Sequence, residues 1–354
     1  MSRRLAIVSS FVALAAASIA TPASAAPAIT FEIGRYDLCV NGTAPKGQLV
    51  TYSLRDSHGT LRLRARTHAE SDGTFYLCPF GSVPTYPEPG DTVKVKTPTA
   101  SRSIVMPDIW PSIDRVTDVI RGHGPKGATL RVQVAATTGD VSRTVTVDDA
   151  GRWRLDLGGV ADILGADQVL VSWKHAGVTV RAVSAAPAVL FSPQSDYVTG
   201  ARNLGRPVSL RLTDADGKVR SDTTAATYGP SFLAFLESAK GRAVNPRSGD
   251  RLRVGIAGGI TLRVPAWNLK ADVSAGRVTG RCMPNAPYEA SAETSFYFDD
   301  DSDFDDYIDT QWSGTTGPDG RFSRRMKLKL GVDVELRCRY PSGDIFVAGI
   351  DTQP

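Results

Sequence analysis

The chain contains many short runs in which apolar and polar residues alternate. Clear examples cover residues 49–54, 130–134, 208–212 and 290–298. An alternation with a period of two places successive side chains on opposite faces of a β-strand, so each run has one face to bury. Few stretches show the 3.6-residue period of an amphipathic helix. The pattern therefore predicts an all-β protein.

The same succession of elements recurs about every 80 residues. A glycine that closes a short strand is found once in each turn of this repeat, at Gly42, Gly122, Gly200 and Gly280. Pro107, Pro187 and Pro265 recur with nearly the same spacing. We expect these prolines to mark the junctions between repeats, because proline cannot continue a β-ladder.

Each repeat also carries a glycine that is followed closely by an aromatic residue. The four cases are Gly73 with Phe75, Gly151 with Trp153, Gly229 with Phe232, and Gly320 with Phe322. The third case is one residue longer than the others. We expect each aromatic side chain to point into the core of its repeat.

Six or seven short strands in about 80 residues, with turn signals between them, are typical of a small antiparallel β-sandwich. The sequence therefore predicts four tandem β-sandwich repeats after a leader. The expected boundaries are residues 1–25 for the leader and 26–108, 109–187, 188–266 and 267–354 for the repeats. Four sandwiches in tandem would form a rod.

Three segments carry a resemblance to a known family. Val198-Thr199-Gly200, Val278-Thr279-Gly280 and Asp72-Gly73-Thr74-Phe75 resemble the bacterial immunoglobulin-like repeats (Big type) of secreted or cell-surface proteins. The resemblance covers nearly all of the chain after the leader. It implies four tandem immunoglobulin-like antiparallel sandwiches that serve as spacers, stalks or adhesive modules. It implies no catalytic residue, and a fold alone does not define a function.

Residues 1–25 have the features of a secretory signal peptide. Arg3 and Arg4 form a basic start, residues 5–20 are apolar, and Ala23-Ser24-Ala25 supplies the small residues of a cleavage site. An uncleaved membrane anchor fits less well because the apolar run is short. We expect cleavage after Ala25 and a secreted, extracellular product, with association with the cell envelope as a further option.

The composition narrows the classes of partner. Hydrophobic residues make up 42% and charged residues 22% of the chain, and nothing after the leader approaches 18 consecutive apolar residues. Lys and Arg number 41 and Asp and Glu 37, so the chain without Arg3 and Arg4 has a net charge of +2. These values argue against nucleic-acid binding and membrane insertion. We expect an extracellular protein or a polysaccharide as partner.

The four cysteines favour two disulfides. Cys39 and Cys78 lie in the first repeat, and Cys282 and Cys338 in the fourth. Strand alternation places the first two sulfurs on an outward face and the last two on an inward face, which favours pairing within each repeat. Bridges that close loops of about 40 and 57 residues would each stabilise the folded state by about 4 kcal/mol in the chain-entropy model. Metal binding is the alternative, but the cysteines and histidines lack ligand spacing.

The fourth repeat contains an acidic insertion. Its glycines Gly280 and Gly320 are about 40 residues apart, whereas the corresponding glycines of the other repeats are about 30 residues apart. Asp301, Asp303 and Asp305 are spaced like the first ligands of a calcium loop, but the glycine at the sixth position and the glutamate at the twelfth are missing. We favour a solvated acidic loop that faces the basic strand Arg321, Arg324, Arg325, Lys327 and Lys329 across neighbouring strands.

No motif indicates catalysis or a cofactor other than calcium. Asp214 and Asp216 precede Gly217 at a position where other repeats have a hairpin turn, so a turn is favoured over a metal site. Trp110 and Trp267 follow junction prolines and are expected to wedge neighbouring repeats together. The sequence thus favours a secreted, non-enzymatic structural spacer or interaction module. The alternative is a carbohydrate- or cell-surface-binding, adhesin-like protein with an exposed aromatic strip and a weak calcium site in the fourth repeat.

A calcium titration tests the acidic insertion. If it is a solvated loop, millimolar calcium will raise the melting temperature of the protein no more than added salt of the same ionic strength does. Calorimetric calcium binding tighter than about 10 μM, lost in Asp301→Asn or Asp303→Asn, would show a dedicated site instead.

Overall fold

The computed structural model describes residues 29–35, 39–78, 86–203, 205, 207–256, 259–294, 309–326, 328 and 332–352. All regular secondary structure in these residues is β-strand, which confirms the all-β prediction. The described residues contain no helix long and apolar enough to cross a membrane. The expected signal peptide lies outside the described residues.

The strands fall into four sets, which we call the first to fourth units. The first unit contains β1 (Thr30–Arg35), β2 (Val40–Thr43), β3 (Leu49–Arg55), β4 (Leu61–His68), β5 (Thr74–Leu77), β6 (Thr92–Lys96) and β7 (Ser101–Val105). The second unit contains β8 (Trp110–Asp114), β9 (Val119–His123), β10 (Thr129–Ala135), β11 (Val141–Thr146), β12 (Arg152–Asp156), β13 (Gln168–His175) and β14 (Val178–Ala185).

The third and fourth units follow the same order. The third unit contains β15 (Ala188–Phe191), β16 (Tyr197–Ala201), β17 (Ser209–Thr213), β18 (Val219–Thr224), β19 (Ala226–Tyr228), β20 (Ser231–Phe235), β21 (Arg251–Val254) and β22 (Ile260–Arg263). The fourth unit contains β23 (Asn268–Asp272), β24 (Arg277–Arg281), β25 (Pro287–Thr294), β26 (Asp309–Thr315), β27 (Arg321–Arg325), β28 (Val332–Arg339) and β29 (Ile345–Asp351).

Each unit is an antiparallel β-sandwich of the immunoglobulin-like kind. In the first unit β1, β2 and β5 form one layer, and β4, β3, β6 and β7 form the other. The other units repeat this arrangement, with β19 as an additional strand in the third. The apolar positions of alternating strands such as β3 and β17 lie between the layers, where Val50, Leu54, Leu210 and Leu212 are fully buried. The prediction of tandem sandwiches is confirmed.

The two glycine motifs of the sequence meet in cross-strand pairs. The strand register places Gly42 opposite Phe75, Gly122 opposite Trp153, Gly200 opposite Phe232, and Gly280 opposite Phe322. All four aromatic side chains are buried, as expected. A Cβ atom on Gly200 would lie 2.0 Å from the carbonyl oxygen of Ala188 and 2.7 Å from the ring of Phe232. Glycine at this position therefore leaves the space that the opposite aromatic ring fills.

A buried carboxylate orders the turn before β6, β13 and β21. Asp91 accepts a hydrogen bond from the backbone N–H three residues earlier, and Asp167 and Asp250 do the same, at 2.8–3.0 Å. In the fourth unit Val332 takes this position, and its N–H donates to the hydroxyl of Thr352 instead. The following residue, Asp333, is exposed.

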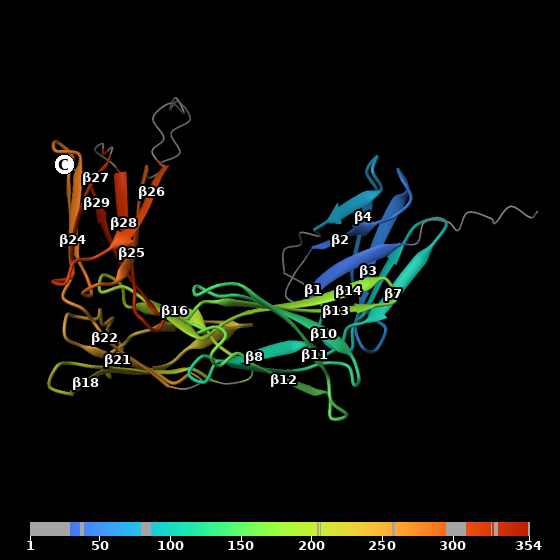
Figure 1. The fold of residues 1–354 in the computed structure, drawn as a ribbon, viewed down its shortest axis with the longest axis horizontal. Coiled ribbons are helices and arrows are strands. Elements are labelled where there is room, and N and C mark those ends of the chain that lie inside the picture. Colours follow the sequence, from blue (N-terminus) through green and yellow to red (C-terminus); the bar gives the residue numbers. More distant parts are fainter. Residues whose placement is uncertain are drawn as a thin grey trace, which may run out of the picture.

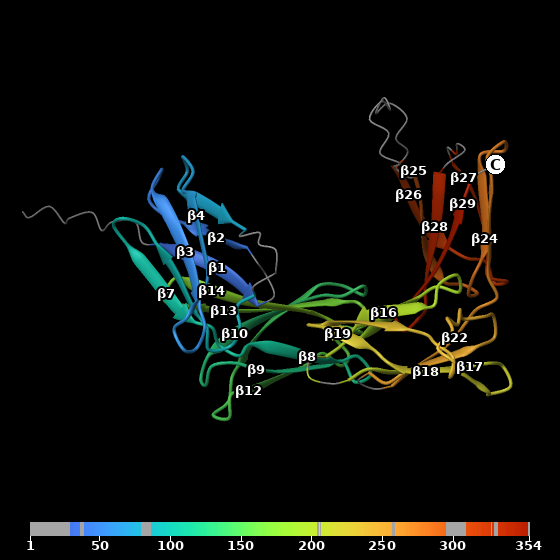
Figure 2. The same ribbon diagram turned by 180° about the vertical axis from the view of Figure 1, so that it is seen from behind.

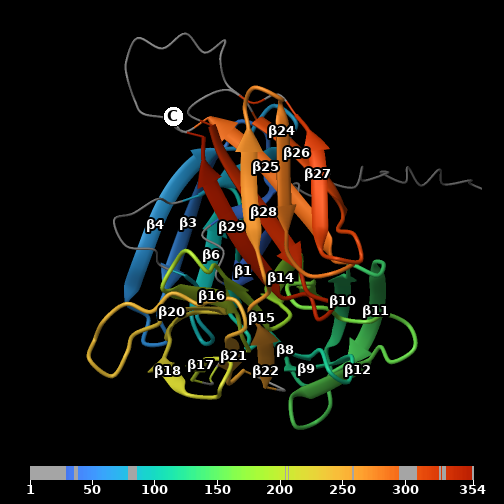
Figure 3. The same ribbon diagram turned by 90° about the vertical axis from the view of Figure 1, so that its left-hand side faces the viewer.

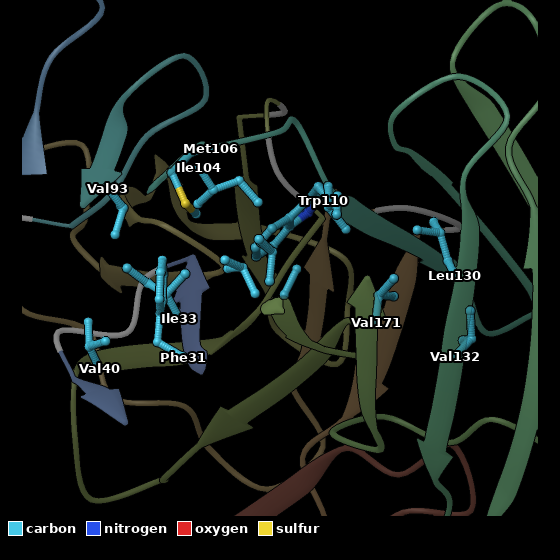
Figure 4. Close-up of a cluster of buried hydrophobic side chains, with 14 of the residues drawn as sticks. Phe31, Ile33, Val40, Val93, Ile104, Met106, Trp110, Leu130, Val132 and Val171 are labelled. Carbon is cyan, nitrogen blue, oxygen red and sulfur yellow. The ribbon is translucent and has the colours of Figure 1, made fainter. Parts of the chain in front are cut away.

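Parallel strand pairs join the units two by two. β1 of the first unit pairs with β14 of the second, and β15 of the third pairs with β29 of the fourth. The result is one seven-stranded and one eight-stranded sheet, each shared by two units. The buried apolar side chains form two clusters with the same division. Figure 4 shows part of the first cluster, which runs from Phe31 and Ile33 past Trp110 to Leu130 and Val171.

The four units form a U rather than the expected rod. The second and third units make the base, and the first and fourth units stand at its two ends on the same side (Figures 1 and 2). In the end-on view of Figure 3 the fourth unit lies above the third. The seven- and eight-stranded sheets face the inside of the U. The rod prediction is wrong because each shared sheet turns one unit away from the axis of its neighbour.

The substitution Gly200→Ala tests the glycine and aromatic pair. Because the new methyl group overlaps a backbone carbonyl, we expect a loss of about 3 kcal/mol in the free energy of unfolding, measured with urea. Gly349→Ala in the same sheet is the control, since its Cβ would lie 3.7 Å from the nearest atom, the carbonyl oxygen of Val334. Equal effects of the two substitutions would contradict this account.

Candidate interaction surfaces

The described residues contain no group of three or more His, Cys, Asp or Glu side chains that could hold a metal ion. Asp214 is a turn residue, because its carboxylate accepts the backbone N–H groups of Asp216 (3.1 Å) and Lys218 (2.8 Å). Asp56 has the same role in the first unit, where the N–H of Thr60 is the main cause of the lowered pKa of that carboxyl. The turn interpretation of the aspartates before Gly217 is therefore supported.

The calcium candidates Asp301, Asp303 and Asp305 lie outside the described residues, so the calcium question stays a prediction. Part of the basic strand expected to face them is described as β27. It pairs with β24, whereas β25 and β26, which flank the acidic segment, pair with each other in the opposite layer. The acidic residues from Asp299 to Asp306 lie outside the described residues, so the expectation that they face this basic strand stays a prediction.

Both disulfides join cysteines of the same unit. The Cα atoms are 4.1 Å apart in Cys39–Cys78 and 6.6 Å apart in Cys282–Cys338. The first bridge is half-buried and links the ends of the neighbouring strands β2 and β5. The second is buried and connects the two layers of the fourth unit. Strand alternation thus identified both the pairing and the face of each bridge.

Junction tryptophans bind neighbouring units together. Trp110 is 7% exposed, and the guanidinium carbon of Arg35 in the first unit lies 5.3 Å from its ring centroid. The ring of Trp267 lies 6.3 Å from that of Phe346, which in turn lies 5.8 Å from the ring of Phe191 in the third unit. All five tryptophans lie in the described residues, and each is buried or half-buried there. An exposed strip built from tryptophans, as the alternative function would suggest, is therefore excluded.

A buried ion pair connects the second, third and fourth units. Asp344 of the fourth unit is fully buried, and its Oδ2 accepts a 2.9 Å hydrogen bond from Arg115 of the second unit, which is 8% exposed. The other carboxylate oxygen accepts the N–H of Val189 in the third unit at 2.9 Å. The carbonyl of Ser342 accepts further hydrogen bonds from Arg115 and from the N–H of Gly165, both at 2.8 Å. The contact therefore fixes three units at one point.

The edge of β8 is covered by a side-chain amide. The Oδ1 of Asn203 accepts the N–H of Ile113 at 2.8 Å, and its Nδ2 donates to the carbonyl of the same residue at 2.9 Å. Asn203 belongs to the third unit and is buried. Pro111 in β8 has no N–H to offer an additional strand. The second and third units are thus joined without sharing a sheet.

The third unit exposes aromatic side chains on the face of the eight-stranded sheet that points into the U. Tyr197 of β16 lies directly opposite Phe235 of β20, and the two are 43% and 52% exposed. Tyr228 is 67% exposed, and Leu233 is half-buried on the same face. We call these four residues the aromatic strip. The repeat pattern did not indicate this strip. The available signal was Phe235, which follows the core residue Phe232 by three residues, an odd spacing that places it on the opposite face of the strand.

The same sheet face continues into the fourth unit, where it becomes polar and hollowed. Leu190 of β15 lies opposite Ile345 of β29 and carries the face across the junction. Beyond it is a cavity of about 360 Å³. Its polar lining residues are Glu289, Ser291, Glu293, Gln311, Ser313, Glu335 and Arg337. Aromatic, hydroxyl, amide and charged groups therefore share one continuous face on the inner side of the U (Figure 1).

No protein-family model matches the chain, and no curated protein matches it. A tetra-tandem repeat in the extending region of a large adhesion protein is 16% identical over 92% of this chain and 100% of that chain, with a TM-score of 0.18. The BSP domain of a biofilm-associated protein is 8% identical over 92% of this chain and 96% of that chain, with a TM-score of 0.19. Native Escherichia coli alpha-2-macroglobulin is 12% identical over 91% of this chain and 28% of that chain, with a TM-score of 0.18. Similarity at this level carries no argument about function.

Removal of Arg115 tests the buried ion pair. Arg115→Met leaves the carboxylate of Asp344 buried without its cation, so we expect a loss of about 3–5 kcal/mol in the free energy of unfolding. Arg154→Met is the control, because Arg154 pairs with Asp156 at an exposed site and should contribute at most about 1 kcal/mol. Urea unfolding measures both, and a similar small effect of each variant would exclude this junction as a major source of stability.

Proposed function

We propose that this protein is a secreted, non-enzymatic tandem immunoglobulin-like repeat protein that acts as an extracellular interaction module. The observation that carries the proposal is the inner face of the eight-stranded sheet. There the aromatic strip and the polar cavity lie on one sheet shared by two units. Binding sites commonly combine such apolar contact area with a few polar groups that orient the ligand.

The U shape favours an interaction module over a structural spacer. A spacer gains length when its units follow one another along a line. In this chain the first and fourth units stand on the same side of the base, which shortens the span (Figures 1 and 2). The shared sheets and the buried contact of Arg115 with Asp344 hold the concave form. A preorganised concave surface lowers the entropy cost of binding a partner.

The conditions of an extracellular compartment suit this chain. Both disulfides connect residues far apart in sequence, with separations of 39 and 56 residues. Structural disulfides of this kind persist in oxidising environments such as the cell exterior. This supports secretion, with an extracellular protein or a polysaccharide as the proposed partner.

The second candidate function is that of a carbohydrate- or cell-surface-binding, adhesin-like protein. The aromatic strip favours it, because exposed aromatic rings on a flat sheet can pack against the apolar faces of sugar rings. The hydroxyl, amide and carboxylate groups of the adjoining cavity could hydrogen-bond to sugar hydroxyls. A weak calcium site at Asp301, Asp303 and Asp305 belongs to this candidate.

A double substitution in the aromatic strip tests the proposed surface. The probes are cell-envelope polysaccharide and surface proteins prepared from the cells that produce this protein, each immobilised and incubated with the secreted chain. We expect Tyr197→Ala combined with Phe235→Ala to reduce the bound fraction about fivefold or more, because two exposed rings are removed from the contact. The melting temperature should stay nearly constant, since both side chains are about half exposed.

The control is Tyr76→Ala, which removes a 67% exposed ring from the seven-stranded sheet instead. It should leave binding unchanged. Undiminished binding by the double variant would exclude the aromatic strip, and no binding by the natural protein would favour the spacer function.

A further inference from the structure

The outer layer of the first unit carries only positive formal charges. Its four strands, β4, β3, β6 and β7, contain no aspartate or glutamate. They contain seven lysines and arginines, namely Arg55, Arg62, Arg64, Arg66, Lys94, Lys96 and Arg102. This layer faces the outside of the U, away from the aromatic strip (Figure 1).

The strand register arranges the outward side chains in two parallel rows. One row runs Arg64, Ser53, Lys94, Ser103 across the four strands, and the next runs Arg66, Thr51, Lys96, Ser101. We call these eight residues the basic face. Strands are spaced by about 4.8 Å, so the cations of β4 and β6 form two columns about 10 Å apart. The hydroxyl groups of β3 lie between the two columns.

The four cations of the basic face are available to a ligand. Arg64, Arg66, Lys94 and Lys96 are all exposed, and none forms an ion pair with the other residues that the structure describes. Arg62 on the same layer differs, because it is engaged by the buried carboxylate of Asp91.

The equivalent layer of the third unit shows what an internally paired face looks like. There Arg211 occupies the position of Ser53, and Asp222 occupies the position of Arg64. Arg211 and Asp222 form an ion pair at 2.7 Å. The first unit lacks such an acidic partner in its four strands, so its positive potential is directed to solvent.

We propose that the basic face binds a linear acidic polysaccharide whose chain lies along β3. The two columns of cations would contact its carboxylate or sulfate groups from both sides, and Thr51 and Ser53 would hydrogen-bond to the chain between them. This site is separate from the inner face of the proposed function, so either can fail without the other.

Side-chain chemistry favours a polysaccharide over other polyanions. The basic face contains no aromatic residue on which a nucleic-acid base could stack. The exposed large apolar residues of this layer are Leu61 and Val105, which lie at strand ends rather than within the two rows. An anionic membrane surface would need an apolar or lipid anchor in addition to the charges. Alternating cations and hydroxyl groups match a polymer that carries both acidic groups and sugar hydroxyls.

The experiment measures binding of the full secreted chain to alginate, heparin, polyphosphate and dextran at several salt concentrations. Alginate and heparin distinguish carboxylate from sulfate groups, polyphosphate tests charge without sugar, and dextran tests sugar without charge. We expect binding to at least one of the acidic polysaccharides, no binding to dextran, and affinity that falls as salt increases. Tighter binding to polyphosphate than to both acidic polysaccharides would overturn the proposal.

Matched variants locate the site. Lys94→Gln with Lys96→Gln should weaken polysaccharide binding about tenfold at about 50 mM salt and reduce the salt slope by about 2, one per cation removed. Arg251→Gln with Arg253→Gln removes the same charge from the equivalent strand of the third unit and should change affinity less than about threefold. Thr51→Val should weaken polysaccharide binding about threefold and leave polyphosphate binding unchanged. Equal losses in the two charge variants, or no effect of Thr51→Val, would refute the proposed position along β3.

Discussion

In every unit the first strand lies at the edge of its own layer, so the N–H and C=O groups along that edge need partners from outside the unit. The partners that complete this edge in the first three units decide the shape of the chain. β1 and β15 complete theirs by pairing in parallel with the last strand of the following unit. β8 is instead completed by the amide of Asn203, and Pro111 discourages strand addition there. Sheets are therefore shared within the first and second units and within the third and fourth, but not between the two pairs.

The link between the two pairs is made by a few polar contacts instead of a shared sheet. The carboxylate of Asp344 would be costly to bury alone, but it receives hydrogen bonds from Arg115 and from the backbone of Val189. Within the pair formed by the third and fourth units, the hydroxyl of Tyr340 donates to the carbonyl of Arg263, and burial raises the pKa of that hydroxyl. Directional contacts of this kind specify one orientation more sharply than apolar packing alone.

Two surfaces with different chemistry follow from this architecture. Sharing of sheets brings the aromatic strip of the third unit onto the same face as the polar cavity of the fourth. The basic face is formed within the first unit alone and lies on the outside of the U. Binding at the inner face would depend on contact area and hydrogen bonds. Binding at the basic face would depend on exposed charge, whose effect is screened by salt. A protein with both could engage a partner through the concave side while the first unit holds an acidic polymer.

The sequence by itself determined the features that depend on local periodicity. Alternation along each strand gave the sandwich class, the inward aromatics such as Phe232, and the faces of all four cysteines, because a period of two assigns every side chain to a face. The recurring glycines indicated four units, although their pairing with the aromatics is visible only in the register. Tertiary structure alone decided the parallel pairs, the U shape and the contact of Arg115 with Asp344. These join residues far apart in the chain, as in the 155-residue separation of Val189 and Asp344, and no local pattern encodes which distant edge or charge will be the partner.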